Sequence, residues 1–290
     1  MNAVSTTLSG YSLSSKAMLV SLTLRAWGGQ RLDQSETSKV AKANKASSDA
    51  VRVTKDLVGK HLDGVRQSER AIRAMHRKYT LPWADDSTRL LPTAVWEDYS
   101  PAMRTLIERH EQQVIPAFIE DYHRIVIPSA QQRLGDLFNA ADFPDDIEGR
   151  FGVSLRFLPV PDSADVRVRL SDAEVQALRE EVEEATREAY EAANREIVER
   201  ASQPLQRLAE ALREYGPGKR LSKSLLENVA DIASLMPGLD LSGRPEVVAL
   251  AREIEALAAH STDRLTSRQR LRESVAAEAD RLLGKINDIF

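Results

Sequence analysis

Glu120 and His123 are the most chemically suggestive pair in this 290-residue chain. Their spacing places both side chains on one face of a helix, and carboxylate-bridged di-iron bundles use such pairs as metal ligands. A complete site also needs a second Glu-x-x-His pair and two more inward carboxylates. None of the four other histidines has a glutamate three residues before it. The pattern therefore favours an ordinary packed or surface histidine over a metal ligand.

Three aspartates and a pair of glycines mark two further positions where a ligand could bind. Asp142, Asp145 and Asp146 surround Phe143-Pro144, but this loop lacks the bidentate glutamate and the glycine of a calcium loop. Gly28-Gly29 follows a strand-like segment without the downstream Gly-Lys-Ser/Thr of a phosphate-binding loop. We interpret the first as a solvated turn with helix-capping carboxylates, and the second as a turn that ends a strand.

The residue types exclude several kinds of catalysis. The chain has no cysteine, which rules out disulfides, thiol catalysis and zinc–thiolate sites and is typical of a reducing cytosol. His110-Glu111 begins a zincin-like motif that fails, because position 114 is valine. The apolar run at residues 17–24 is far shorter than the roughly 20 residues of a membrane span. We expect no enzymatic activity, no cofactor or metal, and no membrane partner.

A basic segment from Glu36 to Tyr79 could bind phosphate groups. It contains eleven Lys/Arg against five Asp/Glu, an excess of six positive charges. Base-stacking aromatic residues are not interleaved with these charges, so pairing with an acidic helix or plain solvation is the alternative. The candidate nucleic-acid contacts are Lys39, Lys42, Lys45, Lys55, Arg66, Arg70, Arg73 and Arg77.

The segment from Tyr79 to Pro92 carries more apolar and aromatic bulk than a simple linker requires. One interpretation is a partner-binding loop in which an aromatic anchor is surrounded by charged residues. The other is a loop whose apolar side chains merely pin it to the core. The candidate partner-binding residues are Leu81, Trp83, Asp85, Asp86 and Arg89.

Two long amphipathic segments position these candidates. The basic segment repeats Val51, Val58, Val65 and Ile72 every seven residues, which predicts a helical packing seam. The segment from Asp172 to Tyr215 has apolar residues at steps of three and four, which predicts a rod of roughly 65 Å. Residues 172–200 hold ten Asp/Glu against four Lys/Arg. Opposite charges and long apolar stripes predict that the two helices pack antiparallel, within one chain or between subunits.

A small antiparallel sheet is predicted beside the helices. Residues 20–27 alternate apolar and polar side chains, and the same alternation recurs at 153–157 and 166–170, with turn residues between them. A lone hairpin is marginal in water, so we expect the first strand to complete a three-stranded sheet. Between the strands, Ser100-Pro101 predicts a helix start, and Pro116 and Pro128 predict kinks.

The chain is predicted to be mainly α-helical, with a long coiled-coil-like antiparallel helical hairpin, the small sheet and a C-terminal helical bundle. Gly216-Pro217-Gly218 is its strongest helix breaker, and three shorter helices are expected after it, near 222–235, 245–260 and 263–289. The expected organisation is a tail at 1–17, a helical rod with the sheet at 18–216, and a C-terminal helical subdomain at 217–290.

Several short motifs together resemble a domain-of-unknown-function family of bacteriophages and mobile elements, over roughly residues 18–180. This family is often encoded near a MoxR-type AAA+ ATPase and a von Willebrand factor A-type protein, which implies an adaptor or substrate of a remodelling machine in the cytoplasm of a bacterial host. It has no established catalytic residues. The motifs are Trp27 with Arg31-Leu32-Asp33, residues 80–83 and 89–92, residues 134–139 with Phe143-Pro144, and residues 157–161 before 166–168.

These patterns support one main hypothesis of function. The chain is expected to be a non-enzymatic phage or mobile-element scaffold or adaptor that self-associates and binds a protein partner, with an AAA+ ATPase as the candidate. The alternative is a DNA- or RNA-binding protein of phage replication or recombination that uses the basic helix at 36–79.

Overall fold

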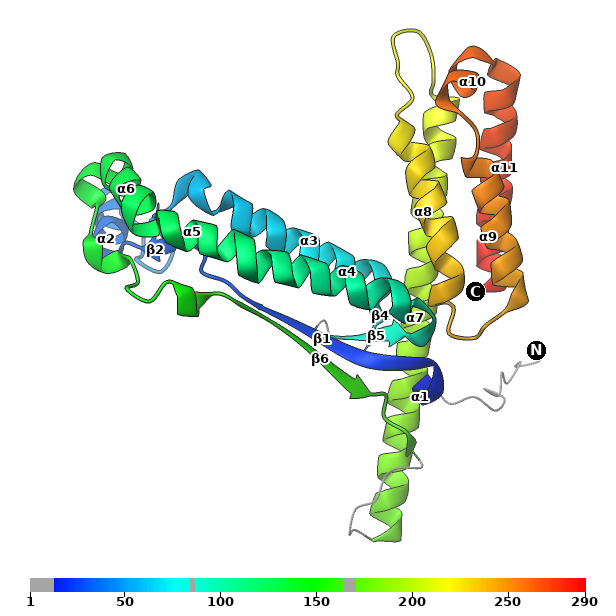
Figure 1. Cartoon of the computed structure of the whole chain (residues 1–290), viewed down its shortest axis with the longest axis horizontal. Coiled ribbons are helices and arrows are strands. Elements are labelled where there is room, and N and C mark those ends of the chain that lie inside the picture. Colours follow the sequence, from blue (N-terminus) through cyan, green and yellow to red (C-terminus); the bar gives the residue numbers. More distant parts are fainter. Residues whose placement is uncertain (1–12, 84–86, 164–170) are drawn as a thin grey trace. The chain divides into compact units, whose positions relative to one another are not determined.

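The computed structural model describes residues 13–83, 87–163 and 171–290, which fold into two compact units. One unit comprises the described residues up to 21 together with 77–98 and 156–290, and we call it the bundle unit. The other comprises residues 22–76 and 99–155, and we call it the hairpin unit. Both are mainly helical with a small antiparallel sheet, as the sequence predicts (Figure 1).

The main sheet has the strand order β4-β5-β1-β6. Residues 17–21 of β1 (Ala17–Arg25) pair antiparallel with β5 (Thr88–Pro92), and β4 (Leu81–Pro82) pairs with the other edge of β5. The predicted neighbour of the first strand is confirmed as β6 (Gly152–Pro159). The expected third strand at 166–170 lies outside the described residues. The three-stranded prediction missed β4 and β5, whose sequence we had interpreted as a loop.

The hairpin unit is built on a long antiparallel helical hairpin. Helix α3 (Asp63–Tyr79) runs beside α4 (Trp96–Arg109), α5 (Ile115–Asp121) and α6 (Ile127–Leu134) (Figure 1). His76 Nδ1 lies 2.9 Å from the Tyr99 hydroxyl, and His110 Nδ1 lies 3.0 Å from Ser68 Oγ. These pairs fix the antiparallel direction. The chain therefore contains a long antiparallel helical hairpin, but its arms differ from the predicted pair at residues 36–79 and 172–215.

Two wider turns interrupt the second arm of this hairpin. Residues 110–114 and 122–126 are π-helical, and each run stands just before an Ile-Pro pair, at Pro116 and Pro128. Proline cannot donate the usual backbone hydrogen bond, and its ring collides with the carbonyl four residues earlier. A π-turn widens the helix at that carbonyl and relieves the collision. The predicted segmentation at the two prolines is confirmed. The predicted start at Ser100-Pro101 is wrong, because α4 begins at Trp96.

The prediction of one helix over residues 36–79 is wrong. The segment divides into α2 (Gln34–Ala43), β3 (Thr54–Asp56), a short 3-10 turn (Gly59–Leu62) and α3; β3 pairs with β2 (Gln30–Leu32). Its apolar residues Val58 and Val65 are buried, but against Ile115 and Phe118 of the hairpin unit. These residues do not belong to the core that contains the acidic helix, so the predicted packing of the two charged segments against one shared core within one chain is wrong. Their pairing between subunits stays a prediction.

The bundle unit is organised around α7 (Asp172–Arg213), the long helix that the sequence predicts. Ser171 caps it through a reciprocal capping box with Glu174. Helices α8 (Lys223–Leu239) and α11 (Gln269–Ile289) pack against its C-terminal half (Figure 1). Helix α9 (Pro245–Ala258) packs against α8 and α11, and the short α10 (Thr262–Ser267) packs against α11. The predicted C-terminal helices and the break at Gly216-Pro217-Gly218 are confirmed.

One hydrophobic core joins α7 to the helices after the break and to part of the sheet. It contains Ile197 and Leu205 of α7, Met236 of α8, Ile254 of α9 and Leu282 of α11, all of them fully buried. Leu81 and Leu90 of the sheet belong to the same core. The predicted boundary at residue 217 therefore does not separate two subdomains, because the helices on its two sides share their buried surface.

Candidate functional site

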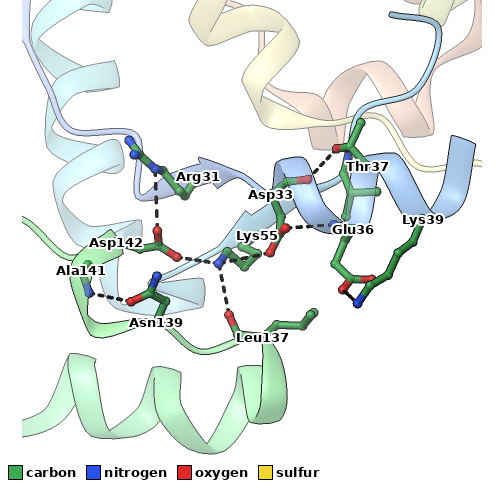
Figure 2. Close-up of polar contacts among 11 residues, drawn as sticks. Arg31, Asp33, Glu36, Thr37, Lys39, Lys55, Leu137, Asn139, Ala141 and Asp142 are labelled. Atoms are coloured by element: carbon green, nitrogen blue, oxygen red, sulfur yellow. Dashed lines mark hydrogen bonds and ion pairs between the residues drawn. The ribbon is translucent and has the colours of Figure 1, made fainter. Parts of the chain in front are cut away.

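A buried lysine lies at the centre of a cluster of polar side chains in the hairpin unit (Figure 2). The Lys55 ammonium is 2.5 Å from Asp142 Oδ2 and 3.3 Å from Asp33 Oδ2, and it donates a hydrogen bond of 3.1 Å to the Leu137 carbonyl. Strand β3 supplies the lysine, Asp33 caps α2, and Asp142 ends a short turn after α6. Three segments distant in sequence therefore meet at one ammonium group.

The charges of this cluster compensate one another. The carboxylate of Asp142 raises the pKa of Lys55 above its ordinary value, against the opposing effect of burial. The backbone N–H of Glu36 lowers the pKa of Asp33, and Lys55 lowers it further. Arg31 Nε adds a second cation at 3.7 Å from Asp142 Oδ1. The lysine thus stays protonated and Asp33 stays ionised across the physiological pH range.

This electrostatic arrangement determines what the cluster can do. An amine with a raised pKa is a poor nucleophile or general base, since both roles need the neutral form. The cluster borders an open polar hollow of about 890 Å³, lined mainly by residues 30–36 and 136–142. Among the described residues no group of three or more His, Asp or Glu side chains is placed to hold a metal ion. We therefore interpret the cluster as structural: its ion pairs and hydrogen bond hold β3 and α2 against the turn after α6.

The predicted nucleic-acid contacts do not form one surface. The prediction that Lys55 contacts nucleic acid is wrong, because its ammonium is buried between two carboxylates and cannot reach a phosphate. Lys39, Lys42 and Lys45 are exposed on α2 and the turn that follows it, and Lys39 pairs with Glu36. The remaining candidates share one face of α3 at steps of four, three and four residues: Arg66, Arg70, Arg73 and Arg77.

The predicted partner-binding residues on the 79–92 segment are mostly turned inward. Leu81 is fully buried in the bundle core, and Trp83 packs against the same core. The Arg89 guanidinium is only 12 % exposed, donates to Thr80 and pairs with Glu196 of α7 at 3.1 Å. The burial of these three residues argues against a partner-binding loop with an aromatic anchor. It favours the alternative, in which the apolar side chains pin the segment to the core. Asp85 and Asp86 lie outside the described residues.

The candidate metal ligands are dispersed. Glu120 and His123 are both exposed, and a π-turn begins between them, which changes the helical spacing on which the pair depends. Asp142 is committed to Lys55, and Asp146 accepts a backbone hydrogen bond from Gly149. Gly28-Gly29 forms the strand-ending turn that the sequence indicates, with Gly29 at φ 67°.

His110 is a buried histidine whose role the sequence did not indicate. Its ring is 1 % exposed, and its Nε2 atom has no hydrogen-bond partner in the described part of the chain. Burial lowers the pKa of this imidazole, against the opposing effect of the nearby Glu69 and Glu111 carboxylates. The folded chain therefore holds the neutral ring to a lower pH than the unfolded chain does.

We expect this histidine to make stability depend on pH. The unfolded chain takes up a proton near pH 6.5 and the folded chain only below that, so stability falls as the pH drops from 7 towards 5. Urea unfolding at pH 7.5 and 5.5, followed by circular dichroism, should show a larger loss in the native chain than in His110→Leu. An identical loss in both proteins would assign the pH dependence to other groups.

The N-terminal half of α7 carries an apolar stripe that belongs to neither core of the described residues. Residues 172–188 contain no buried side chain, and the first α7 residue in the bundle core is Ala189. Val175, Leu178, Val182 and Ala185 nevertheless recur at helical spacing and are only partly exposed. The same stretch has seven Asp/Glu against two Lys/Arg. We call residues 172–188 the acidic arm.

The opposite end of α7 is basic. The segments 214–223 and 261–273 together hold seven Lys/Arg against three Asp/Glu. They are neighbours in the bundle unit, since the Arg272 guanidinium stacks 4.7 Å from the centre of the Tyr215 ring. Arg220, Arg268 and Arg270 are exposed. We call this end of the bundle unit the basic end.

The acidic character of the arm could be predicted from the sequence, but its exposure could not. The apolar stripe runs without interruption from the arm into the buried half of α7, so periodicity alone assigns both halves to a core. Only the packing of α8 and α11 against the C-terminal half shows which half belongs to the bundle core of the described residues.

Comparison with known proteins gives no relative from which a function could be inferred. The chain matches no family model, no curated protein and no solved structure. In the described part of the chain, no helix is both long enough and apolar enough to cross a membrane.

Proposed function

We propose that this chain is a non-enzymatic scaffold or adaptor protein that self-associates head to tail. The observation that carries the proposal is the acidic arm, a helical stretch with an apolar stripe that neither core of the described residues covers. An amphipathic helix gains most of its stability from packing its apolar face, so an unpacked stripe is a natural docking element.

The opposite charges of the acidic arm and the basic end favour a second copy of the chain as the partner of the arm. The acidic arm has a formal charge of −5 and the segments of the basic end have +4. The two ends cannot meet within one chain, because α7 separates them rigidly. Its 42 residues span roughly 60 Å at 1.5 Å per residue. A contact between the arm of one copy and the basic end of the next is heterologous and, unless a ring closes, builds an open chain.

The test of this proposal is the mass of the purified protein in solution. We expect light scattering behind a sizing column to give a mass that rises with protein concentration and passes the dimer without a plateau. High salt should lower that mass, because the proposed contact is partly electrostatic. A concentration-independent monomer, or a dimer that does not grow, would contradict open head-to-tail assembly.

A protein partner belongs to the same proposal. The resemblance to a bacteriophage and mobile-element family supports a MoxR-type AAA+ ATPase as that partner, in the cytoplasm of a bacterial host. A pull-down with the tagged full chain from cells that carry the element, followed by mass spectrometry, tests this directly. Recovery of a stoichiometric AAA+ ATPase supports it, and recovery of the chain alone leaves only self-association.

Nucleic-acid binding is the second candidate function, and the arginine stripe on α3 favours it. Arg70 and Arg73 are exposed at the middle of this stripe and could reach successive phosphates. Titration of single- and double-stranded DNA at two salt concentrations separates the candidates. Phosphate binding by the stripe requires a steep salt dependence that becomes shallower in Arg70→Ala/Arg73→Ala. The scaffold proposal requires no such affinity.

A further inference from the structure

A cavity of about 500 Å³ opens on the bundle unit between α7, α8 and the last turn of α3. This volume lies within the range of small-molecule sites, roughly 300–1,000 Å³. Its residues are separate from both the acidic arm and the basic end. The proposed self-association therefore does not involve this cavity.

The floor of the cavity is apolar. Pro204 of α7 faces Leu225, Ile232 and Leu235 of α8 across it. Leu225 and Leu235 are partly exposed at the cavity, although both also pack against the bundle core. Such a surface favours a ligand with a hydrocarbon or aromatic body, because covering it removes apolar area from water.

The wall of the cavity is cationic. Arg77, Lys78, Arg200 and Arg207 line it, and Glu196 and Asp231 are the carboxylates among the lining residues that the structure describes. One of these carboxylates is already compensated, since Glu196 pairs with both Arg89 and Arg200. The remaining excess of positive charge lies beside an apolar floor.

Arg200 gives the site a fixed frame. Its guanidinium donates to the Lys78 carbonyl at 3.1 Å and to the Thr80 carbonyl at 2.8 Å, and its side chain is only 20 % exposed. These bonds hold the end of α3 against α7, so the α3 cations and the α7 cations face the same cavity. Arg77, Lys78 and Arg207 are exposed and can turn toward a ligand.

We propose that this cavity binds a small amphipathic anion, an organic carboxylate or phosphate that carries an apolar group. The anionic group pairs with Arg207 or with Arg77 and Lys78, and the apolar group covers Pro204 and the α8 leucines. A nucleotide fits less well, because no aromatic side chain lines the cavity to stack on a base.

The proposal is tested with the fluorescent probe 1-anilinonaphthalene-8-sulfonate, which combines a sulfonate with an aromatic body. We expect saturable binding of one probe per folded chain. Octanoate should displace the probe. Octylamine, which has the same chain with the opposite charge, and acetate, which has the charge without the chain, should not.

Two variants and a control localise the site. Arg207→Glu should weaken probe binding about tenfold or more by replacing attraction with repulsion, and Asn228→Trp should do the same by filling the cavity. Arg252→Glu reverses an exposed arginine outside the cavity and should leave binding unchanged. Circular dichroism confirms that each variant is folded. Absence of saturable binding, equal displacement by octylamine, or affinity unaffected by both Arg207→Glu and Asn228→Trp would overturn the proposal.

Discussion

Replacing Leu178 with lysine is expected to disrupt self-association of the chain. Leu178 lies in the middle of the stripe on the acidic arm, so in the proposed contact its side chain is covered by the basic end of a second copy. Lysine would remove the apolar contact and place a positive charge against a positive surface. We expect a loss of about 2 kcal/mol in association, which is close to a thirtyfold change in dissociation constant.

The matched control for this substitution is Gln176→Lys. It adds the same charge two residues away, on a different face of the same exposed helix. Analytical ultracentrifugation should show weakened association only for Leu178→Lys, while both variants keep the native circular dichroism spectrum. Equal behaviour of the two variants would mean that net charge, rather than the stripe, governs association.

Lys55→Met is expected to destabilise the hairpin unit strongly. Removing the ammonium leaves the Asp33 and Asp142 carboxylates without their shared counterion and the Leu137 carbonyl without its donor. Breaking a buried ion pair on one side typically costs 3–5 kcal/mol, and we expect about 3 kcal/mol because the cluster borders an open hollow. Urea unfolding measures this change.

Two further variants identify the cause of that loss. Lys39→Met removes an exposed lysine with a surface partner and should leave the stability nearly unchanged. In the double variant Lys55→Met/Asp142→Asn the uncompensated charge is reduced, so part of the lost stability should return. Purely additive effects of Lys55→Met and Asp142→Asn would show that the ion pair is not the source.

The helices could be predicted where local signals agree with packing. Ser171 with Glu174 marks the start of α7, and the Gly-Pro-Gly run marks the break before α8, because capping and chain breaking are local effects. The basic segment misled for the opposite reason. The seven-residue recurrence of Val51, Val58, Val65 and Ile72 crosses a loop, a strand and a 3-10 turn, so it was coincidental as a helical signal.

The candidate sites depended on long-range contacts that no local pattern contains. From the sequence alone, Lys55 looks like one more exposed cation in a basic segment. The structure shows instead that it forms an ion pair with Asp142, which is distant in sequence. Leu81 and Arg89 were likewise assigned to a loop, because the sequence does not show their contacts with α7. Leu81 shares a core with α7, and Arg89 pairs with Glu196 of that helix. The absence of the acidic arm from both cores of the described residues likewise depends on where the bundle ends, which the sequence of α7 alone does not specify.

The central claim is that the acidic arm of one copy binds the basic end of another, and mixing two blocked variants tests it most directly. Leu178→Lys keeps a functional basic end, and Arg268→Glu/Arg270→Glu keeps a functional arm. Each variant alone should be a monomer by light scattering. Their mixture should form a one-to-one dimer that grows no further. A mixture that stays monomeric, or variants that still assemble alone, would contradict head-to-tail association.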